Sequence, residues 1–167
     1  TVQASHGPVR FGDTKEGTMA IRLHPALRLR GDVAAGAARN SAGITGRAVW
    51  GKRATWVDYY GTIDDTPVGV ALFDHPSSPS HPTWWHARDY GLVAANPFGV
   101  HDFERKPAGT GERTVAEGES LVFRYRILLH AGEATDVNQA YADYVDSSWT
   151  LPAQVAPDGS SAGPRTK

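Results

Sequence analysis

The alternation of side chains from Ser120 to His130 constrains the fold more than any other feature of the sequence. If the segment is extended, one face carries five large apolar side chains: Leu121, Phe123, Tyr125, Ile127 and Leu129. The other face carries three basic and two apolar residues: Arg124, Arg126, His130, Val122 and Leu128. Because successive side chains of a strand point to opposite faces, this period of two predicts a long β-strand.

Several other segments alternate in the same way or are rich in β-branched and aromatic residues, which favours further strands. They are Thr18–Leu23, Ala54–Tyr60, Pro67–Phe73, Trp84–Arg88 and Leu92–Ala95. Both faces of Pro67–Phe73 are apolar or small, which predicts a strand covered on both sides. The turn Gly61–Asp65 before it predicts a hairpin, and Asp89–Gly91 is expected to join the last two strands. Gly31–Gly46 has no period and is interpreted as a long flexible loop.

One helix is predicted near the C-terminal end, where Asp136 can cap it with Gln139 at capping-box spacing. Its apolar face is formed by Val137, Ala140, Tyr141, Tyr144 and Val145. Many strands and one helix predict an antiparallel β-sandwich over residues 1–149. The segment 150–167 is rich in turn residues and is expected to be disordered.

Composition excludes several classes of function. The net charge is -1 and there is no basic stripe, which argues against nucleic-acid binding. No apolar stretch approaches membrane-spanning length, and the absence of cysteine excludes disulfides and thiolate chemistry. The chain begins TVQASHG, without an initiator methionine or a visible signal peptide. We therefore expect the protein to be cytoplasmic, and we expect this chain to be a piece of a longer protein.

The segment from Phe73 to Phe103, FDHPSSPSHPTWWHARDYGLVAANPFGVHDF, concentrates the residues that could form a site. It holds four of the seven histidines of the chain: His75, His81, His86 and His101. Such a density of titratable groups beside aromatic residues indicates a pocket for a polar ligand. We expect His75, His81, His86, Arg88 and Asp89 to converge in one cleft.

Within this segment, His86, Arg88 and Tyr90 are two residues apart and would share one face of an extended chain. The candidate catalytic residues are His86, His81 and Asp89, because a histidine beside a carboxylate can transfer protons near neutral pH. The candidate substrate-binding residues are His75, Arg88, Trp84, Trp85, Tyr90, Asn96 and His101.

Trp84 and Trp85 would point to opposite faces, so that one enters the core and the other can stack on a sugar ring. The pair Lys15–Glu16 is bracketed by glycines, and a glutamate aimed at a histidine would be a candidate acid or base. No zinc signature is present, so no cofactor is predicted and a divalent metal is not favoured.

Four segments together resemble the bacterial proteins commonly labelled the PmoA family. They are Phe11–Leu23, Ala48–Gly61, Phe73–Phe103 and Glu119–Gly132, and the resemblance covers most of residues 8 to 146. It implies a β-sandwich of the galactose-mutarotase-like kind in a family that tends to accompany sugar-metabolising enzymes. Longer members carry a further N-terminal half, which implies that this chain is the C-terminal portion of a larger sandwich.

The residues and the resemblance together lead us to expect a carbohydrate ligand and proton transfer on a sugar or glycosidic bond. The activity would be that of a hydrolase, lyase or epimerase. Two alternatives stay open, a non-catalytic carbohydrate-binding module and a structural or interaction domain. If an N-terminal half is missing, exposed sheet edges would favour self-association.

Overall fold

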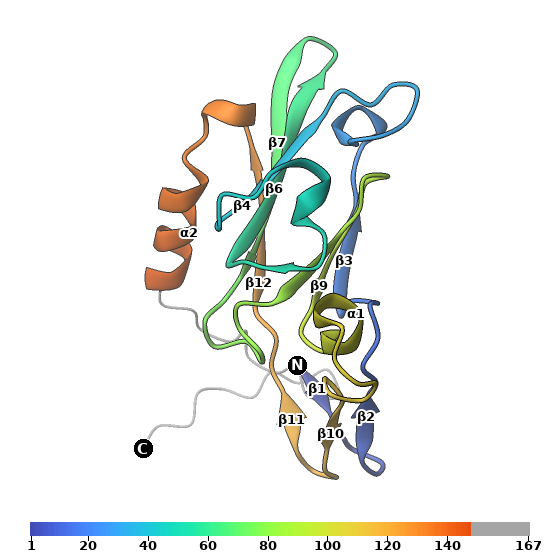
Figure 1. Cartoon of the computed structure of the whole chain (residues 1–167). Coiled ribbons are helices and arrows are strands. Elements are labelled where there is room, and N and C mark those ends of the chain that lie inside the picture. The colour runs from blue at the N-terminus through green and yellow to red at the C-terminus, as the bar shows by residue number, and fades with distance from the viewer. Residues whose placement is uncertain (148–167) are drawn as a thin grey trace.

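The computed structural model describes residues 1–147 and shows an antiparallel β-sandwich (Figure 1). The first sheet has the strand order β12 (Tyr125–His130), β7 (Thr66–Asp74), β6 (Trp56–Ile63) and β4 (Ala37–Asn40). The second has the order β3 (Met19–Arg22), β9 (Leu92–Asn96), β8 (Trp84–Ala87) and β5 (Lys52–Arg53). The mainly β class predicted from the alternating segments is therefore confirmed. The expected boundary at residue 149 and the tail 150–167 lie outside the described residues.

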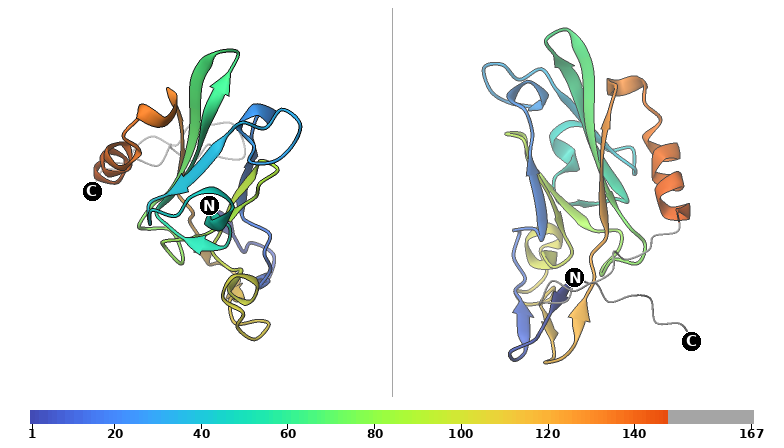
Figure 2. Two further views of the ribbon diagram at one scale, coloured as in Figure 1. Left: turned by 45° about the horizontal axis from the view of Figure 1, so that its top comes forward. Right: turned by 180° about the vertical axis from the view of Figure 1, so that it is seen from behind.

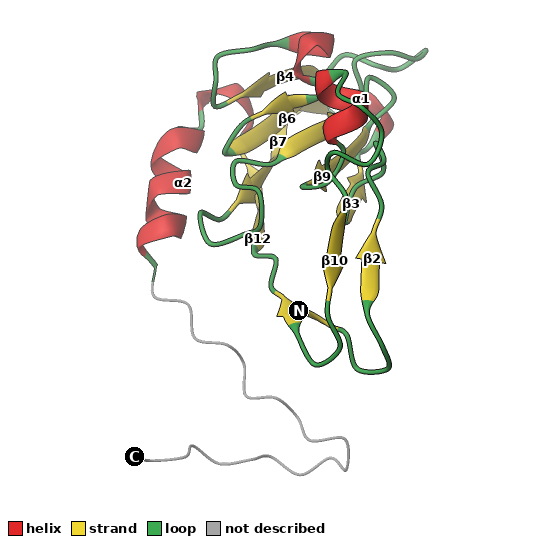
Figure 3. Ribbon diagram, turned by 60° about the horizontal axis from the view of Figure 1, so that its bottom comes forward, coloured by secondary structure: helices red, strands yellow, loops and turns green. Residues whose placement is uncertain are grey.

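Two small antiparallel pairs extend from one end of the sandwich (Figures 1 and 2). They are β1 (Val2–Gln3) with β11 (Ser120–Leu121), and β2 (Val9–Phe11) with β10 (Arg113–Val115). The helices are α1 (Val100–Glu104) and α2 (Val137–Asp146), and the 3-10 turns are η1 (Pro25–Leu27), η2 (Gly46–Val49) and η3 (Gly132–Ala134). Helices α2 and α1 lie on different sides of the two sheets (Figures 1 and 3).

The main core lies between the two sheets and is built from the inward side chains of both. Its largest fully buried members are Trp85, Tyr59, Leu72, Val49, Val57 and Val93. A second cluster joins the outer face of the first sheet to α2, through Trp56, Ala71, Phe73, Val137 and Tyr144. Strand β7 contributes to both clusters, which confirms the strand that was predicted to be covered on both sides.

Helix α2 begins where its cap was predicted. The Asp136 carboxylate accepts a hydrogen bond from the Gln139 backbone N–H at 3.0 Å. The Gln139 side chain donates to Asp143 instead of completing a capping box. The predicted apolar face packs against the first sheet through Val137 and Tyr144. The predicted C-terminal helix is confirmed, and a second, short helix, α1, which the sequence did not predict, forms after the buried segment around Asn96.

Two predictions of strand extent were wrong. The segment 120–130 forms two strands, because β11 pairs with β1 whereas β12 pairs with β7. The presumed flexible loop 31–46 contains β4, whose Ala38 enters the main core. Small residues suit this stretch because the chain passes close to its neighbours: a Cβ on Gly36 would lie 2.3 Å from the Leu27 carbonyl oxygen.

The β6–β7 hairpin is longer than predicted. Its turn is formed by Asp64 and Asp65, whose φ angles are 47° and 62°. A two-residue turn with two positive φ angles matches the twist of the flanking strands. Pairing therefore continues to Ile63 and Thr66, beyond the expected turn at Gly61.

One side of the sandwich is open between the edge strands β3 and β12. An apolar groove of about 370 Å³ runs between them, lined by residues that include Ile21, Val70 and Leu129. The Leu129 side chain is 75 % exposed, and Ile127 is 47 % exposed. Strands β3 and β12 are edge strands of their sheets, and self-association through exposed edges stays a prediction. None of the helices in the described part of the chain is long and apolar enough to cross a membrane.

Gly69 of β7 is pressed against the His130 ring on the neighbouring strand. A Cβ at this position would lie 2.0 Å from His130 Cε1, so the ring or the strand would have to move. We expect Gly69→Ala to lower the free energy of unfolding by about 1–3 kcal/mol, the usual cost of overpacking. Gly12→Ala is the control, because its Cβ would meet only Thr14 Cγ2 at 3.7 Å. Equal urea unfolding midpoints for the two variants would contradict the expectation.

Candidate functional site

The direction of the His86 side chain follows from the burial of its neighbour. Trp85 of β8 is fully buried between the sheets, so the adjacent His86 points to the outer face of the second sheet. There it lies against two aromatic rings, Trp50 after η2 and Phe103 in α1, with centroid distances of 6.2 and 6.4 Å. These rings leave His86 only 3 % exposed.

Trp50 fixes the tautomer of His86. The Trp50 Nε1–H can only donate, and it lies 3.3 Å from His86 Nδ1. The proton of the neutral ring is therefore on Nε2. Burial lowers the pKa of His86, and the charge of Arg88 lowers it further, while the carboxylate of Glu16 acts in the opposite direction. His86 is thus a neutral N–H donor near pH 7.

Arg88 follows directly on β8 and lies beside the same surface. Its guanidinium carbon is 5.8 Å from the centroid of the Trp50 ring and 5.4 Å from that of Tyr90. The Arg88 backbone is held by a 3.2 Å hydrogen bond from the Tyr59 hydroxyl to its carbonyl oxygen. Arg88 therefore lies between the Trp50 ring beside His86 and the Tyr90 ring. Tyr90 itself is in the turn after β8, so the alternation assumed for an extended segment does not reach it.

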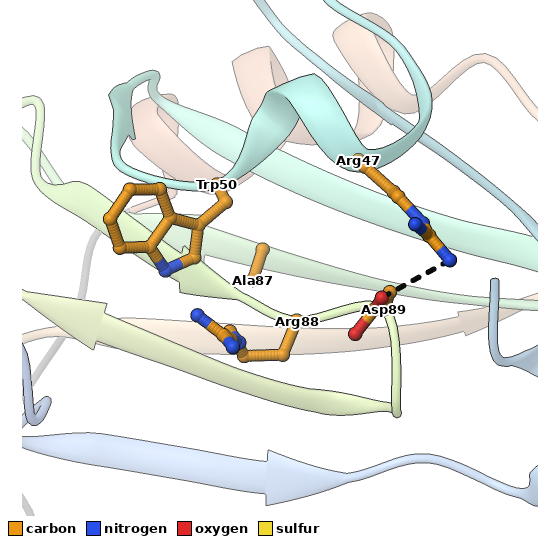
Figure 4. A pocket seen from close by; sticks show the side chains of 5 residues that line it. All are labelled: Arg47, Trp50, Ala87, Arg88 and Asp89. Atoms are coloured by element: carbon orange, nitrogen blue, oxygen red, sulfur yellow. Dashed lines mark ion pairs between the residues drawn. The ribbon is translucent and has the colours of Figure 1, made fainter. Parts of the chain in front are cut away.

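A pocket of about 150 Å³ opens beside these residues, lined by Arg47, Trp50, Ala87, Arg88 and Asp89. Figure 4 shows the Arg88 side chain beneath the Trp50 ring, and Asp89 directed toward Arg47. The Asp89 carboxylate lies 3.3 Å from Arg47 and 3.4 Å from Arg30. Because two arginines hold this carboxylate, its geometry suits the shaping of the pocket better than proton transfer.

The structure places His75 and His81 elsewhere, so the expected convergence of five residues in one cleft was wrong. His81 Nδ1 lies 2.9 Å from Asp74 Oδ2, at the end of β7 in the first sheet. The His75 ring is 5.2 Å from Tyr144 of α2, which covers that sheet. The physical reason is that β7 and β8 belong to different sheets. The loop between them carries these two histidines away from His86.

The Asp74–His81 pair is a well-formed but separate cluster. Asp74 is fully buried, and its Oδ2 also accepts the Thr83 backbone N–H at 2.9 Å. Burial raises the pKa of Asp74, although its hydrogen bonds and His81 oppose the shift. The carboxylate orders the turn before β8, and this structural role is sufficient to explain the buried pair without a catalytic function.

The tryptophan stacking platform was predicted at the wrong residues. Trp85 is in the core as expected for one of the pair, and its Nε1–H donates to the Ala54 carbonyl oxygen at 2.8 Å. Trp84 is only 6 % exposed, because Arg53 lies over its ring at 4.4 Å. The accessible indole at this face is Trp50, which lies outside the histidine-rich segment.

Asn96 and His101 hold loops together. The Asn96 Oδ1 accepts the backbone N–H groups of Phe98 and Gly99, both at 2.9 Å. His101 is exposed, and its Nδ1 lies 2.6 Å from the Lys106 carbonyl oxygen. Both positions have a local structural explanation that does not involve the surface around His86.

Two important neighbours of His86 come from distant parts of the chain. Glu16 lies in the loop before β3, in the glycine-bracketed pair that the sequence had suggested could be aimed. Nothing in the sequence around Trp50, apart from the glycine that follows it, indicated that this residue would lie beside His86. Gly51 has a φ of 68°, and a Cβ there would lie 3.0 Å from the Phe103 ring.

Within residues 1–147, no group of three histidine, cysteine or acidic side chains is arranged to hold a metal ion. The chain belongs to the family described as "Family of unknown function (DUF6807)", whose model matches residues 1–143. Comparisons with curated proteins and with solved structures gave no match. The family description names no activity, so the resemblance to the PmoA family stays a prediction.

The lowered pKa of His86 predicts a pH dependence of stability. Below its ordinary pKa of 6.5, the unfolded chain binds a proton that folded His86 resists. Stability is therefore lost as the pH falls from about 7 through the ordinary pKa of 6.5 toward the lowered pKa of the folded protein. We expect His86→Gln to lose less unfolding free energy over this range than the unaltered protein.

Comparing His86→Gln with the unaltered protein separates the contribution of His86 to the pH dependence of stability from the contributions of other groups. The lowered pKa of His75 acts in the same direction, and the raised pKa of Asp74 acts in the opposite one. Both contributions are present with and without the substitution. Urea unfolding at each pH measures the difference, and identical losses would show that His86 titrates normally in the fold.

Proposed function

We propose that the chain binds a carbohydrate on the outer face of the second sheet and transfers a proton on it, with Glu16 as the acid or base. The observation that carries this proposal is the environment of His86. A buried, neutral imidazole with its tautomer fixed by Trp50 lies within electrostatic reach of the exposed carboxylate of Glu16. The choice of a sugar rests on the resemblance to PmoA-family proteins.

The roles follow from the donors and acceptors present. Since Trp50 occupies Nδ1, His86 can offer a ligand only the hydrogen on Nε2. Such a neutral N–H donor stabilises negative charge that develops on a sugar oxygen. The proton itself moves between Glu16 and a sugar oxygen or carbon. Arg88 holds the ligand beside them through its guanidinium N–H groups.

The same tautomer favours a second candidate function, a non-catalytic carbohydrate-binding module. In this geometry His86 has no acceptor nitrogen left to take a proton. It can therefore bind the ligand by donating a hydrogen bond, but it cannot act as a base. The two candidates differ in the role of Glu16. A binding module needs the carboxylate only as a hydrogen-bond acceptor, whereas an enzyme needs it to change its protonation state.

Replacing Glu16 by glutamine keeps size and hydrogen bonding but removes the titrating group. We expect Glu16→Gln to lower turnover about a hundredfold or more and to change ligand affinity little, in line with general acid-base contributions. The measurement is a turnover screen of mono- and oligosaccharides, followed by titration calorimetry. Glu117→Gln, a substitution at an exposed turn away from His86, is the matched control.

Each outcome distinguishes the candidates. Unchanged turnover in Glu16→Gln would reject Glu16 as the acid or base. Sugar binding without turnover in the unaltered protein would establish the binding module. Failure of every sugar to bind would favour the structural or interaction domain over both.

A further inference from the structure

Five arginines surround the turn between β8 and β9. They are Arg22, Arg28, Arg30, Arg47 and Arg88, and we call them the arginine cluster. They come from β3, the segment around η1, η2 and the end of β8. Backbone hydrogen bonds from Leu29 and Arg30 to the Asp89 carbonyl oxygen, at 2.9 and 3.1 Å, hold the η1 segment against this turn.

The cluster contains much more positive than negative charge. Its one ion-paired carboxylate is Asp89, which Arg30 and Arg47 share. Within residues 1–147, no hydrogen bond or ion pair engages the guanidinium groups of Arg22, Arg28 or Arg88. The chain as a whole has a net charge of -1, so this concentration of positive charge is local. A local excess of one sign attracts ligands of the opposite charge.

Two of these arginines lie near the same aromatic ring, Tyr90. Arg22 of β3 and Arg88 after β8 lie on either side of β9, both aligned with Leu92. Their guanidinium carbons lie 5.9 and 5.4 Å from the centroid of the same Tyr90 ring. A ring holds a guanidinium by a cation–π contact but accepts few of its five N–H groups. The remaining N–H donors of each side chain are available to a ligand.

We propose that the arginine cluster binds the acidic group of an anionic sugar, a carboxylate or a phosphate, through Arg22 and Arg88. The planar fork of a guanidinium matches the oxygens of either group. This inference rests on the proposed carbohydrate function, because the anion would lie next to His86 and the pocket in Figure 4. It makes the charge of the sugar the main determinant of specificity.

An anionic sugar fits the surface better than a nucleic acid does. A nucleic acid needs a basic stripe that follows several phosphates, often with a series of rings for the bases. Here the arginines without an ion pair gather around a single turn, beside Tyr90 and Trp50, and do not form a stripe. A single anionic group on a compact polar ligand is sufficient to accept hydrogen bonds from these arginines.

The test is titration calorimetry of the 167-residue chain with glucuronate, glucose 6-phosphate, glucose and inorganic phosphate. We expect an acidic sugar to bind about tenfold or more tightly than glucose, as charged hydrogen bonds to two arginines require. The advantage should disappear in the double variant Arg22→Gln/Arg88→Gln. It should persist in Arg113→Gln, an exposed arginine of β10 outside the cluster.

The remaining outcomes separate this inference from the proposed function. Equal affinity for glucose and glucuronate would overturn the anionic specificity and leave the carbohydrate function standing. Binding of inorganic phosphate without binding of any sugar would overturn both, as would no binding at all. If the double variant does not melt cooperatively, the single variants carry the comparison, since Arg22 is exposed and its replacement leaves the core untouched.

Discussion

The burial of Trp85 is the constraint on which the arrangement of the second sheet depends. Its side chain is fully enclosed between the sheets, its Nε1–H donates to Ala54, and its carbonyl oxygen accepts the Gly51 N–H. A slip of β8 by one residue would expel this indole and bring His86 into the apolar core. The cost of that exchange fixes the register of the strand. It thereby places His86 on the outer face.

A buried ion network gives the first sheet a comparable anchor. Asp58 of β6 is fully buried and accepts hydrogen bonds from Arg39 of β4 at 2.9 Å and from His130 of β12 at 2.8 Å. The second nitrogen of His130 lies 2.9 Å from the Gly132 carbonyl oxygen, which ties η3 to the sheet. Removing one partner of such a network leaves a buried charge without compensation and is strongly destabilising. The network therefore holds three strands and the start of the α2 region in one arrangement.

The candidate site combines side chains from strand β8 with side chains from more distant regions of the chain. Strand β8 supplies His86 and leads to Arg88, whereas Trp50, Glu16 and Phe103 arrive from three other regions of the chain. The hydrogen bond between Trp50 and His86, for example, joins residues that are 36 positions apart. The chemical character of His86, a neutral donor whose Nε2–H has no hydrogen-bond partner among residues 1–147, is therefore a property of the assembled sandwich. The isolated segment around it would leave the imidazole solvated and free to titrate.

The sequence by itself determined the class of the fold, most of its strands and the capped helix α2. These features depend on periods of two or 3.6 residues, which local side-chain direction enforces. Tertiary structure alone decided that β7 and β8 enter different sheets, which separates His75 and His81 from His86. It also decided that 120–130 divides between two partners, that β4 forms from a stretch of small residues, and that Trp50 rather than Trp84 faces the pocket. The physical reason is that strand pairing and burial depend on which distant surfaces complement each other, and no local pattern encodes that choice.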